Sequence, residues 1–445
     1  MYYKNILPFG KAWLGYLWEG LVRLPMYNII MYIVQLGVAI ASLFNGKLKK
    51  MWRGERDSFR VLREKVDPNA RYIWVHAASL GEFEQGRPII EYLREHRPEY
   101  KILLTFFSPS GYEVRKNYEG ADIICYLPID TVTNARRFLR TIRPEIAFFI
   151  KYEFWYNYLH ILNHRKVPVY SVSSIFRPNQ VFFRWYGKEY AHVLKCFTAF
   201  FVQNEESKQL LENIGIKNVK VTGDTRFDRV MQIADQSRTL ELVKAFKDGK
   251  PTFIAGSSWQ PDEEIFIPYF EKHKDWKLII APHVIGEDHL QQIDNLLKGR
   301  KVERYTEMMS MQTRGKQPLD DELVERLQNA EVLIINCFGL LSSIYKYGDV
   351  AYVGGGFGVG IHNVLEAAVW NMPVVFGPNH DKFQEAKELI AAGGGYPING
   401  SDDFAKIMDS FIADKASLAT SSQKAGEYVK SASGATDKVL DAVNL

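Results

Sequence analysis

The sequence predicts an α/β protein of two domains, each built on a parallel β-sheet covered by helices. Its 445 residues exceed the roughly 150 residues of an average domain. Short apolar runs alternate with amphipathic stretches in two separate series, which is typical of parallel sheets covered on both faces. A polar stretch over residues 230–249 separates the two series.

Composition excludes several classes of protein. Hydrophobic residues make up 47% and charged residues 24% of the chain, and the net charge is +4. These values argue against a disordered chain and against a whole-surface nucleic-acid binder. The three cysteines are widely spaced and form neither a disulfide framework nor a metal-binding pattern, so a reducing compartment and no metal site are expected.

The segment 27–44 carries no charge and is just long enough to cross about 30 Å of hydrocarbon. The aromatic-rich stretch 13–24 before it suits a membrane interface. We expect a membrane-associated segment over residues 1–50, spanning the bilayer or lying in one leaflet. The alternative is a pair of buried helices in a soluble domain. Met26 is a possible alternative start.

Basic residues follow this segment directly. They are Lys47, Lys49, Lys50, Arg53 and Arg56. Such a cluster is typical of the cytoplasmic side of a membrane, where it meets anionic headgroups.

The first series predicts seven strands and their connecting helices. The strands are expected at 72–76, 102–106, 123–126, 146–150, 167–172, 200–202 and 217–222. One helix is expected at 88–96, with Pro88 in its first turn, and another at 133–143. The first domain is bounded at 51–235, followed by a linker over 236–250.

The second series predicts six strands. They are expected at 252–255, 278–281, 302–305, 331–335, 350–353 and 373–376. The second domain is bounded at 251–425, and a C-terminal helix at 426–445. Ligands of such sheets bind outside the carboxyl ends of the strands, so loops after strands are the candidate sites.

The clearest local motif is a glycine-rich loop at 354–360, between a strand and a helix. Glycines let backbone N–H groups converge, and a helix N-terminus adds partial positive charge, which together suit a phosphate. The spacing matches neither the dinucleotide fingerprint nor the phosphate-binding loop. A flexible turn is the alternative. Glu366 follows Asn363 by three residues, which fits a capping box or a carboxylate for ribose hydroxyls.

Other candidates also follow strands. Glu82 closes a tight loop after the first strand. It could act as a general base or balance a helix dipole, and Glu84 is the alternative residue for either role. Arg226 could neutralise a phosphate or pair with a neighbouring aspartate. Lys151 could form a surface ion pair with Glu153, and His283 could be structural.

Several motifs in order make the chain resemble the 3-deoxy-D-manno-octulosonic acid (Kdo) transferases of Gram-negative bacteria. They are WRGER (52–56), VHAASLGE (75–82), YEFWYN (152–157), QNEES (203–207), VTGDTRFD (221–228), GSSW (256–259), APH (281–283), YGDVAYVGGGFGVGIHNVLEAA (347–368) and PVVFGPNHDKF (373–383). The resemblance implies a GT-B fold of two facing Rossmann-like domains with an N-terminal membrane-anchor helix. The first domain would take the acceptor and the second the CMP-sugar.

The resemblance implies an inverting glycosyltransferase that moves Kdo from CMP-Kdo to the tetraacylated lipid A precursor and releases CMP, in lipopolysaccharide biosynthesis. It implies no cofactor, no metal and no nucleic-acid partner, and a place on the cytoplasmic side of the bacterial inner membrane. Glu82 would be the proton acceptor, with Lys151 and Arg226 stabilising the transition state. The residues implied to bind the CMP-sugar are Pro282, His283, Phe338, Gly339, Leu340, Gly356, Gly358, Gly360, Asn363, Val364, Leu365 and Glu366.

The chain departs from the family pattern at four positions. Leu340 stands where glutamate is common and His283 where arginine is usual. Lys151 replaces a carboxylate, and Arg226 replaces a lysine. Three other readings stay open: a nucleotide-sugar epimerase, another membrane-surface transferase such as one acting on lipid-linked peptidoglycan precursors, and a non-catalytic binding scaffold.

Overall fold

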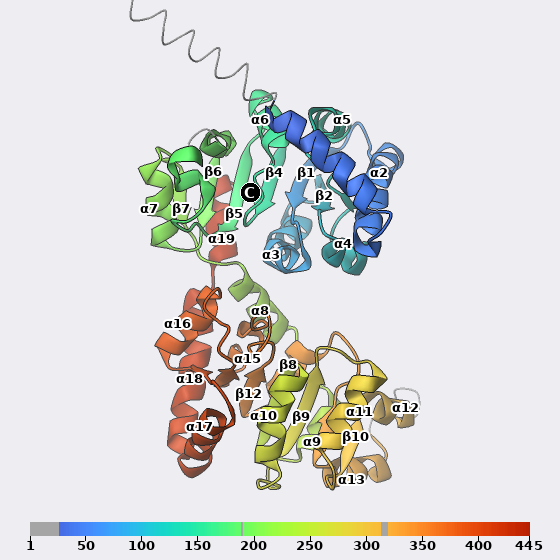
Figure 1. Ribbon diagram of the computed structural model, residues 1–445, viewed down its shortest axis with the longest axis vertical. Coiled ribbons are helices and arrows are strands. Elements are labelled where there is room, and N and C mark those ends of the chain that lie inside the picture. The colour runs from blue at the N-terminus through green and yellow to red at the C-terminus, as the bar shows by residue number, and fades with distance from the viewer. Residues whose placement is uncertain (1–25, 188–189, 313–318) are drawn as a thin grey trace, which may run out of the picture. The chain divides into compact units, whose positions relative to one another are not determined.

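A computed structural model of the protein describes residues 26–187, 190–312 and 319–445 (Figure 1). The described chain forms two compact units. The first includes the residues up to Thr225 together with Gly434–Leu445, and the second is Arg226–Ser433. The predicted aromatic interface stretch at 13–24 lies outside the described residues.

The first unit is built on a parallel seven-stranded sheet, as its alternating pattern predicts. The strand order is β3-β2-β1-β4-β5-β6-β7. The strands are β1 (Arg71–His76), β2 (Tyr100–Phe106), β3 (Ile123–Tyr126), β4 (Ile146–Ile150), β5 (Val169–Ser174), β6 (Ala199–Val202) and β7 (Val219–Val221). Nearly every residue of β1 and β4 is buried, because helices cover both faces.

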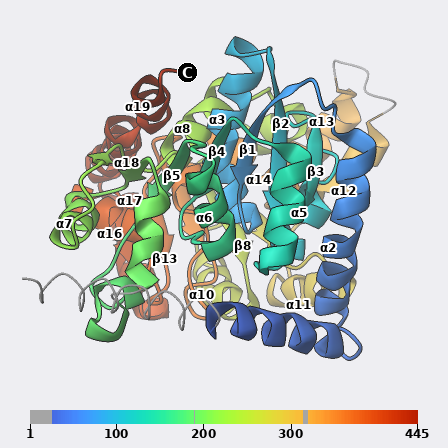
Figure 2. The ribbon, with the colours of Figure 1, turned by 90° about the horizontal axis from the view of Figure 1, so that it is seen from above.

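Helices of the first unit connect these strands. They are α2 (Gly46–Lys65), α3 (Leu80–His96), α4 (Pro109–Arg115), α5 (Val132–Ile142), α6 (Tyr156–His164), α7 (Glu205–Asn213) and α19 (Ala435–Val443), with 3-10 turns η1 (Val181–Phe183), η2 (Trp185–Gly187) and η3 (Tyr190–Cys196). The view in Figure 2 shows α5 and α6 side by side, and the two helices pack against each other. Helix α3 begins eight residues earlier than predicted, so Pro88 lies inside it rather than in its first turn. Ser79 caps this earlier start by accepting from the N–H of Glu82.

The apolar segment forms a helix over residues 26–41. Its polar side chains face the first unit: the Tyr27 hydroxyl donates to Asp130 at 2.8 Å, and the Asn157 amide donates to Asn28 at 3.0 Å. Apolar side chains face outward at helical spacing. The most exposed are Met26, Ile29, Ile30, Ile33, Leu36 and Ile40. Among the described helices, none is long and apolar enough to cross a membrane.

The second unit repeats the plan of the first. Its parallel seven-stranded sheet has the order β10-β11-β9-β8-β12-β13-β14. The strands are β8 (Thr252–Ser258), β9 (Lys277–Pro282), β10 (Val302–Arg304), β11 (Val332–Ile334), β12 (Val350–Val353), β13 (Val374–Phe376) and β14 (Gly395–Pro397). The edge strand β14 is not among the predicted strands, because its three residues carry almost no apolar signal.

Helices of the second unit cover both faces of this sheet. They are α8 (Arg226–Asp235), α9 (Glu241–Lys247), α10 (Gln260–Phe270), α11 (Glu287–Leu296), α12 (Tyr305–Met311), α13 (Asp321–Asn329), α14 (Leu341–Ile344), α15 (Leu365–Ala368), α16 (Gln384–Ala392), α17 (Ser401–Ala413) and α18 (Lys415–Ala432), with the 3-10 turn η5 (Tyr345–Tyr347). A single C-terminal helix was predicted over 426–445, but the structure has two helices in this region, α18 and α19. The first, α18, packs in the second unit, whereas α19 returns to the first unit, where Val439 and Leu440 join the core beside β1 and α3.

Candidate functional site

Each sheet has a central point at which the strand order reverses, and open α/β sheets bind ligands at such a point. In the first unit β1 and β4 are neighbours although two strands separate them in sequence. The loops that follow them carry the predicted residues Glu82 and Lys151. The sheet order, which alternation alone does not determine, therefore brings these two predicted residues to one edge.

Glu82 lies in the first turn of α3. Its Oε2 accepts from the N–H of Ala78 at 2.6 Å, which holds the carboxylate over the end of β1. Burial first, and the negative charge of Glu153 second, raise the pKa of Glu82 to about 7, while the Ala78 N–H and the charge of Lys151 lower it. A carboxylate with a pKa near neutrality is suited to accept a proton from an alcohol. The position is compatible with both predicted roles, balance of the helix dipole and general base.

Glu153 lies partly buried in a hydrogen-bond network with His76 and Trp155. Its Oε2 accepts from Trp155 Nε1 at 2.6 Å and lies 3.1 Å from Nε2 of His76. Trp74 donates to the Thr105 hydroxyl, which in turn can donate to Nδ1 of His76 at 2.8 Å. In this arrangement Nδ1 of His76 accepts a hydrogen bond, so the ring proton is on Nε2, which donates to Glu153. The negative charge next to Glu82 is thus held in place from β1, β2 and the loop after β4.

Lys151 and Arg226 have different surroundings. Lys151 has a positive φ of 66°, and its Nζ lies 5.4 Å from the centre of the Tyr152 ring. Its charge acts on Glu82, as noted above. Arg226 begins α8 in the second unit and donates from Nη1 to Glu385 Oε1 at 2.7 Å. Sequence reasoning considered only neighbouring aspartates as partners of Arg226, because Glu385 is 159 residues away.

The second unit has its reversal between β8 and β12. The GSSW segment ends β8 and the glycine-rich loop follows β12, so both lie at this point (Figure 1). Gly354 must be a glycine because a Cβ there would lie 2.3 Å from the backbone oxygen of Ser257. Gly355 and Gly360 have positive φ values of 92° and 141°. The loop is therefore a closely packed structure rather than a flexible turn.

Only part of the loop offers N–H groups to a ligand. The N–H of Gly355 donates to Asp262, and those of Gly358 and Gly360 both donate to the Gly355 carbonyl. In this conformation Gly358 and Gly360 therefore do not present their amides to a phosphate, contrary to the expectation of a fully convergent loop. Within the described residues, the N–H groups of Gly356, Phe357 and Val359 form no hydrogen bond.

The carboxylate of Glu366 joins the predicted segment 363–366 to Ser342, two residues beyond the predicted segment 338–340. Glu366 Oε2 accepts from the Ser342 hydroxyl at 2.5 Å, and its Oε1 accepts from the Asn363 amide at 3.1 Å. Helix α15 begins at Leu365, with Val364 as N-cap, so the predicted capping box with Asn363 as N-cap does not form. Phe338 is 76% exposed beside Gly339, whose φ is 89°.

His283 follows β9 and packs against two rings that sequence reasoning did not select. Its ring centre lies 4.6 Å from that of Trp259 and 4.6 Å from that of His362. Burial lowers the pKa of His283, and burial together with His283 lowers the pKa of His362 to about 4. The stack is therefore neutral at pH 7. Trp259 belongs to the GSSW motif. That motif was noted in the sequence, but it did not predict the contact of Trp259 with His283.

No arrangement of three or more His, Cys, Asp or Glu side chains suited to a metal ion occurs in the described ranges.

Comparison with known proteins identifies the family of this chain. Residues 53–229 match the family described as 3-Deoxy-D-manno-octulosonic-acid transferase (kdotransferase). The 3-deoxy-D-manno-octulosonic acid transferase of Aquifex aeolicus is 26% identical, with 77% of this chain and 86% of that protein covered. These matches support the Kdo transferase family for this chain, and with it a glycosyltransferase. The catalytic candidate Glu82 lies inside the matched region.

Two further comparisons bear on length and fold. A bifunctional glycosyltransferase/methyltransferase of Fusobacterium nucleatum is 24% identical over 77% of this chain, and the chain spans about half of that protein, 53% of its length. The crystal structure of UDP-GlcNAc 2-epimerase from Neisseria meningitidis bound to UDP-GlcNAc has a TM-score of 0.59 at 15% identity, covering 84% of this chain and 99% of that one. This likeness shows the fold alone, an α/β fold of the GT-B type with two parallel seven-stranded sheets.

Proposed function

We propose that this Kdo transferase moves Kdo from CMP-Kdo to the tetraacylated lipid A precursor, with inversion at the anomeric carbon and release of CMP. The observation that supports it best is Glu82, a carboxylate at the reversal point of the first sheet whose pKa is raised to about 7. The family match covers the whole first sheet.

The proposed step is a single displacement. A primary hydroxyl of the acceptor attacks the anomeric carbon of Kdo, and the bond between that carbon and the phosphate oxygen of CMP breaks. Glu82 takes the hydroxyl proton, and CMP leaves with the bonding electron pair. Attack opposite to the leaving group inverts the anomeric centre. General-base assistance of this kind contributes roughly a hundredfold or more to the rate.

The donor would be bound by the second unit. The free N–H groups of Gly356, Phe357 and Val359 are suited to a phosphate oxygen. Glu366, already fixed by Ser342 and Asn363, is placed near the carboxyl end of β12, where a ribose hydroxyl could donate to it. The neutral stack at His283 provides a flat aromatic surface.

Membrane attachment on the cytoplasmic side of the inner membrane is part of the proposal. A helix with its polar side chains turned toward the protein and its apolar side chains turned outward is unusual in water and typical of an interfacial helix. The basic cluster from Lys47 to Arg56 follows it. A lipid acceptor would stay in the bilayer while its sugar hydroxyl reaches the enzyme.

The test is mass spectrometry of lipid A precursor after incubation with the protein and freshly generated CMP-Kdo. We expect the mass of at least one added Kdo. Glu82→Gln should lower turnover by about a hundredfold or more with CMP binding retained, whereas Glu84→Gln, two residues along the same helix, should keep it. Full turnover of the Glu82→Gln variant would remove Glu82 from the mechanism.

A second measurement tests the donor site. Glu366→Ala should weaken CMP binding in calorimetry by about tenfold, since a charged hydrogen bond is worth roughly 1.5 kcal/mol or more. Unchanged affinity would leave Glu366 with a structural role only.

The fold likeness to an epimerase favours one alternative, a nucleotide-sugar epimerase. An epimerised nucleotide sugar, with no CMP released and no sugar transferred to lipid, would support that alternative. Raised melting temperature with uridine rather than cytidine nucleotides would favour a transferase of another donor class.

A further inference from the structure

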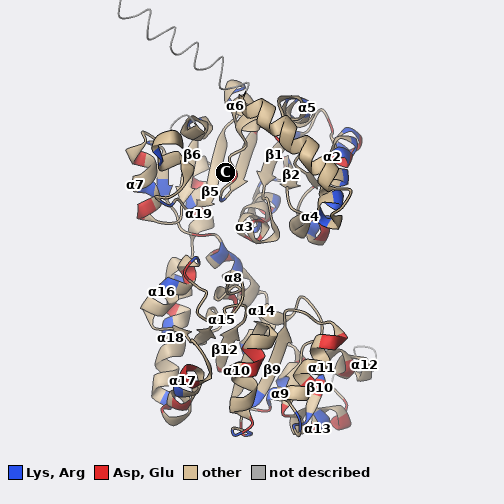
Figure 3. Cartoon of the chain, viewed as in Figure 1, with Lys and Arg blue, Asp and Glu red and all other residues tan. Residues whose placement is uncertain are grey.

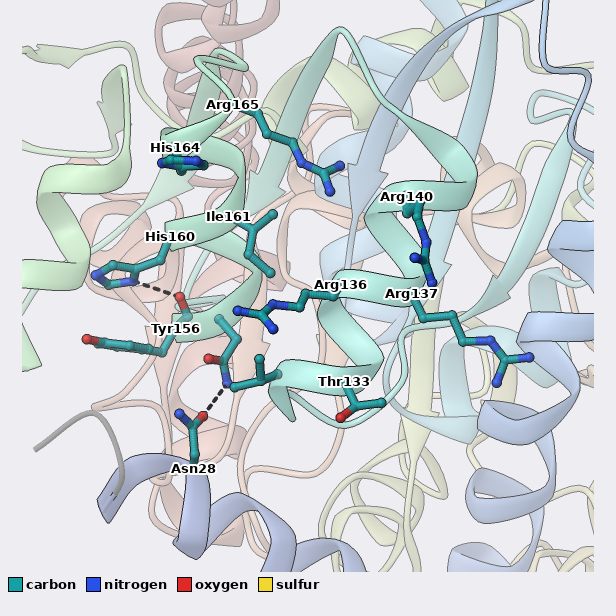
Figure 4. Close-up of a pocket in the computed structure, with 12 residues that line it drawn as sticks. Asn28, Thr133, Arg136, Arg137, Arg140, Tyr156, His160, Ile161, His164 and Arg165 are labelled. Atoms are coloured by element: carbon teal, nitrogen blue, oxygen red, sulfur yellow. Dashed lines mark hydrogen bonds between the residues drawn. The ribbon is translucent and has the colours of Figure 1, made fainter. Parts of the chain in front are cut away.

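A cationic hollow lies between α5 and α6, away from the loops described above. Its volume is about 910 Å³, and Figure 4 shows the side chains around it. It is lined by Asn28, Val132, Thr133, Arg136, Arg137, Arg140, Tyr156, Asn157, His160, Ile161, His164 and Arg165. Four arginines and two histidines thus surround one open space with no carboxylate among its lining residues.

The guanidinium groups have no acidic partner. Within the described residues, Arg136, Arg137, Arg140 and Arg165 form no ion pair. Arg165 donates to the Leu139 carbonyl at 2.8 Å, a contact that positions it without neutralising it. Other arginines of this unit, such as Arg71 and Arg94, do pair with carboxylates.

The positive surface continues beyond the first hollow. A second hollow of about 440 Å³ is lined by Arg140, Arg143 and Arg165 together with Pro144, Leu162 and Val167. Arg140 and Arg165 line both. Like charges held this close repel one another, so a site built from five arginines is stabilised by an anion that several guanidinium groups bind together.

The hollow adjoins the outward-facing apolar helix. Asn28 of that helix lines the hollow and accepts from Asn157, as Figure 4 shows. One turn further along, the hydroxyl of Tyr32 lies 2.9 Å from that of Thr133, at the start of α5. Asp130, which precedes α5, is buried and accepts from Tyr27 and from the N–H groups of Asn157 and Tyr158. An anion in the hollow would therefore meet guanidinium groups and the polar face of this helix, whose apolar side chains face outward beside it.

We propose that the hollow binds the phosphodiester headgroup of an anionic membrane phospholipid, with its acyl chains along the outward side of the helix over residues 26–41. The inference rests on the proposed membrane attachment and goes beyond it by naming the lipid group that is recognised and the residues that recognise it. Charge complementarity selects an anion, and the adjoining apolar residues select an amphiphile over a soluble phosphate. Arginine suits a phosphodiester because its planar fork binds two oxygens at once.

The test is co-sedimentation of the full chain with vesicles of phosphatidylcholine alone or with about one third phosphatidylglycerol. The hollow variant carries Arg136→Gln, Arg140→Gln and Arg165→Gln. The matched control removes the same charge at exposed lysines in or next to β7 and on α19, as Lys217→Gln, Lys220→Gln and Lys438→Gln. Each basic residue at an anionic surface is worth roughly a fivefold change in binding. We expect the hollow variant to bind the anionic vesicles about 100-fold more weakly and the control to stay within about twofold of the unmodified chain.

The outcomes separate this inference from the proposed function. Equal losses in both variants would mean general charge attraction and would overturn the site, as would strong binding of the hollow variant. Inorganic phosphate could stabilise the unmodified chain but not the hollow variant, while both bind vesicles equally. That result would overturn the lipid site and assign the hollow to a soluble anion. Absence of vesicle binding by the unmodified chain would overturn the site and the proposed membrane attachment together. Kdo transfer to detergent-dispersed acceptor by the hollow variant would leave the catalytic proposal standing.

Discussion

Glu82→Gln should make the protein more stable at alkaline pH while it lowers turnover by about a hundredfold or more. Glutamine keeps the shape of the side chain and can still accept from the Ala78 N–H. It removes the negative charge that burial and Glu153 disfavour. A carboxylate that is placed for chemistry at the expense of stability is a common feature of active sites.

The magnitude follows from the pKa. Burial first, and Glu153 second, raise the pKa of Glu82 from 4.5 to about 7. Because the folded pKa is the higher one, the stability contributed by the protonated group is fully present below pH 4.5 and is lost as the pH rises through 7. One pKa unit corresponds to about 1.4 kcal/mol, so the ionised group costs the folded state at most about 3.5 kcal/mol. Glu82 keeps some contact with water, so we expect about 1–2 kcal/mol.

The assay is urea unfolding of both proteins at pH 5 and pH 8.5, followed by tryptophan fluorescence. The stability difference between Glu82→Gln and the unmodified chain should grow in favour of the variant as the pH rises. Glu84→Gln is the control. Glu84 lies on the same helix and pairs with Arg87 of α3 and Arg115 of α4, and the loss of these pairs should cost at most about 1 kcal/mol. A difference that is independent of pH, or that grows in favour of the unmodified chain, would refute the electrostatic account of Glu82.

Three further predictions concern other residues. Glu153→Gln should move the acid limb of the kcat/KM profile to lower pH, because the charge of Glu153 raises the pKa of Glu82; an unmoved limb would contradict this. Gly354→Ala should destabilise the protein by about 2–4 kcal/mol in thermal unfolding, because the added Cβ would clash with the backbone of Ser257. Gly358→Ala is the control and should cost less than about 1 kcal/mol, since the nearest atom to its added Cβ lies at 3.6 Å. His283→Arg should tighten CMP binding in calorimetry by about threefold or more, because it adds a charged donor; weaker binding would show that the neutral stack matters more than the missing charge.

Several features of the fold could be predicted from the sequence because they depend on local pattern. Apolar runs of four to seven residues between helical stretches predicted the strands around Trp74, Phe148 and Tyr352, and all are buried strands. Short elements with weak patterns were missed or shifted. The start of α3 was placed at Pro88 because proline favours first turns, but the cap at Ser79 determined the real start.

Part of the candidate site could likewise be predicted from local motifs, and part could not. Sequence motifs identified Glu82, the glycine-rich loop and Glu366, since each follows a strand or precedes a helix. They did not predict that Glu153 is held by His76 and Trp155, 77 and two residues away.

The sequence by itself determined the two α/β series, the family and the residues that carry the proposed chemistry, because motifs and periodicity are properties of neighbouring residues. Only the tertiary structure decided the order of the strands, and with it which loops share an edge of each sheet. It also decided which N–H groups of the glycine-rich loop are already used, what raises the pKa of Glu82, and that the arginines of α5 and α6 surround one hollow. These features depend on contacts between residues far apart in the chain, which no local pattern encodes.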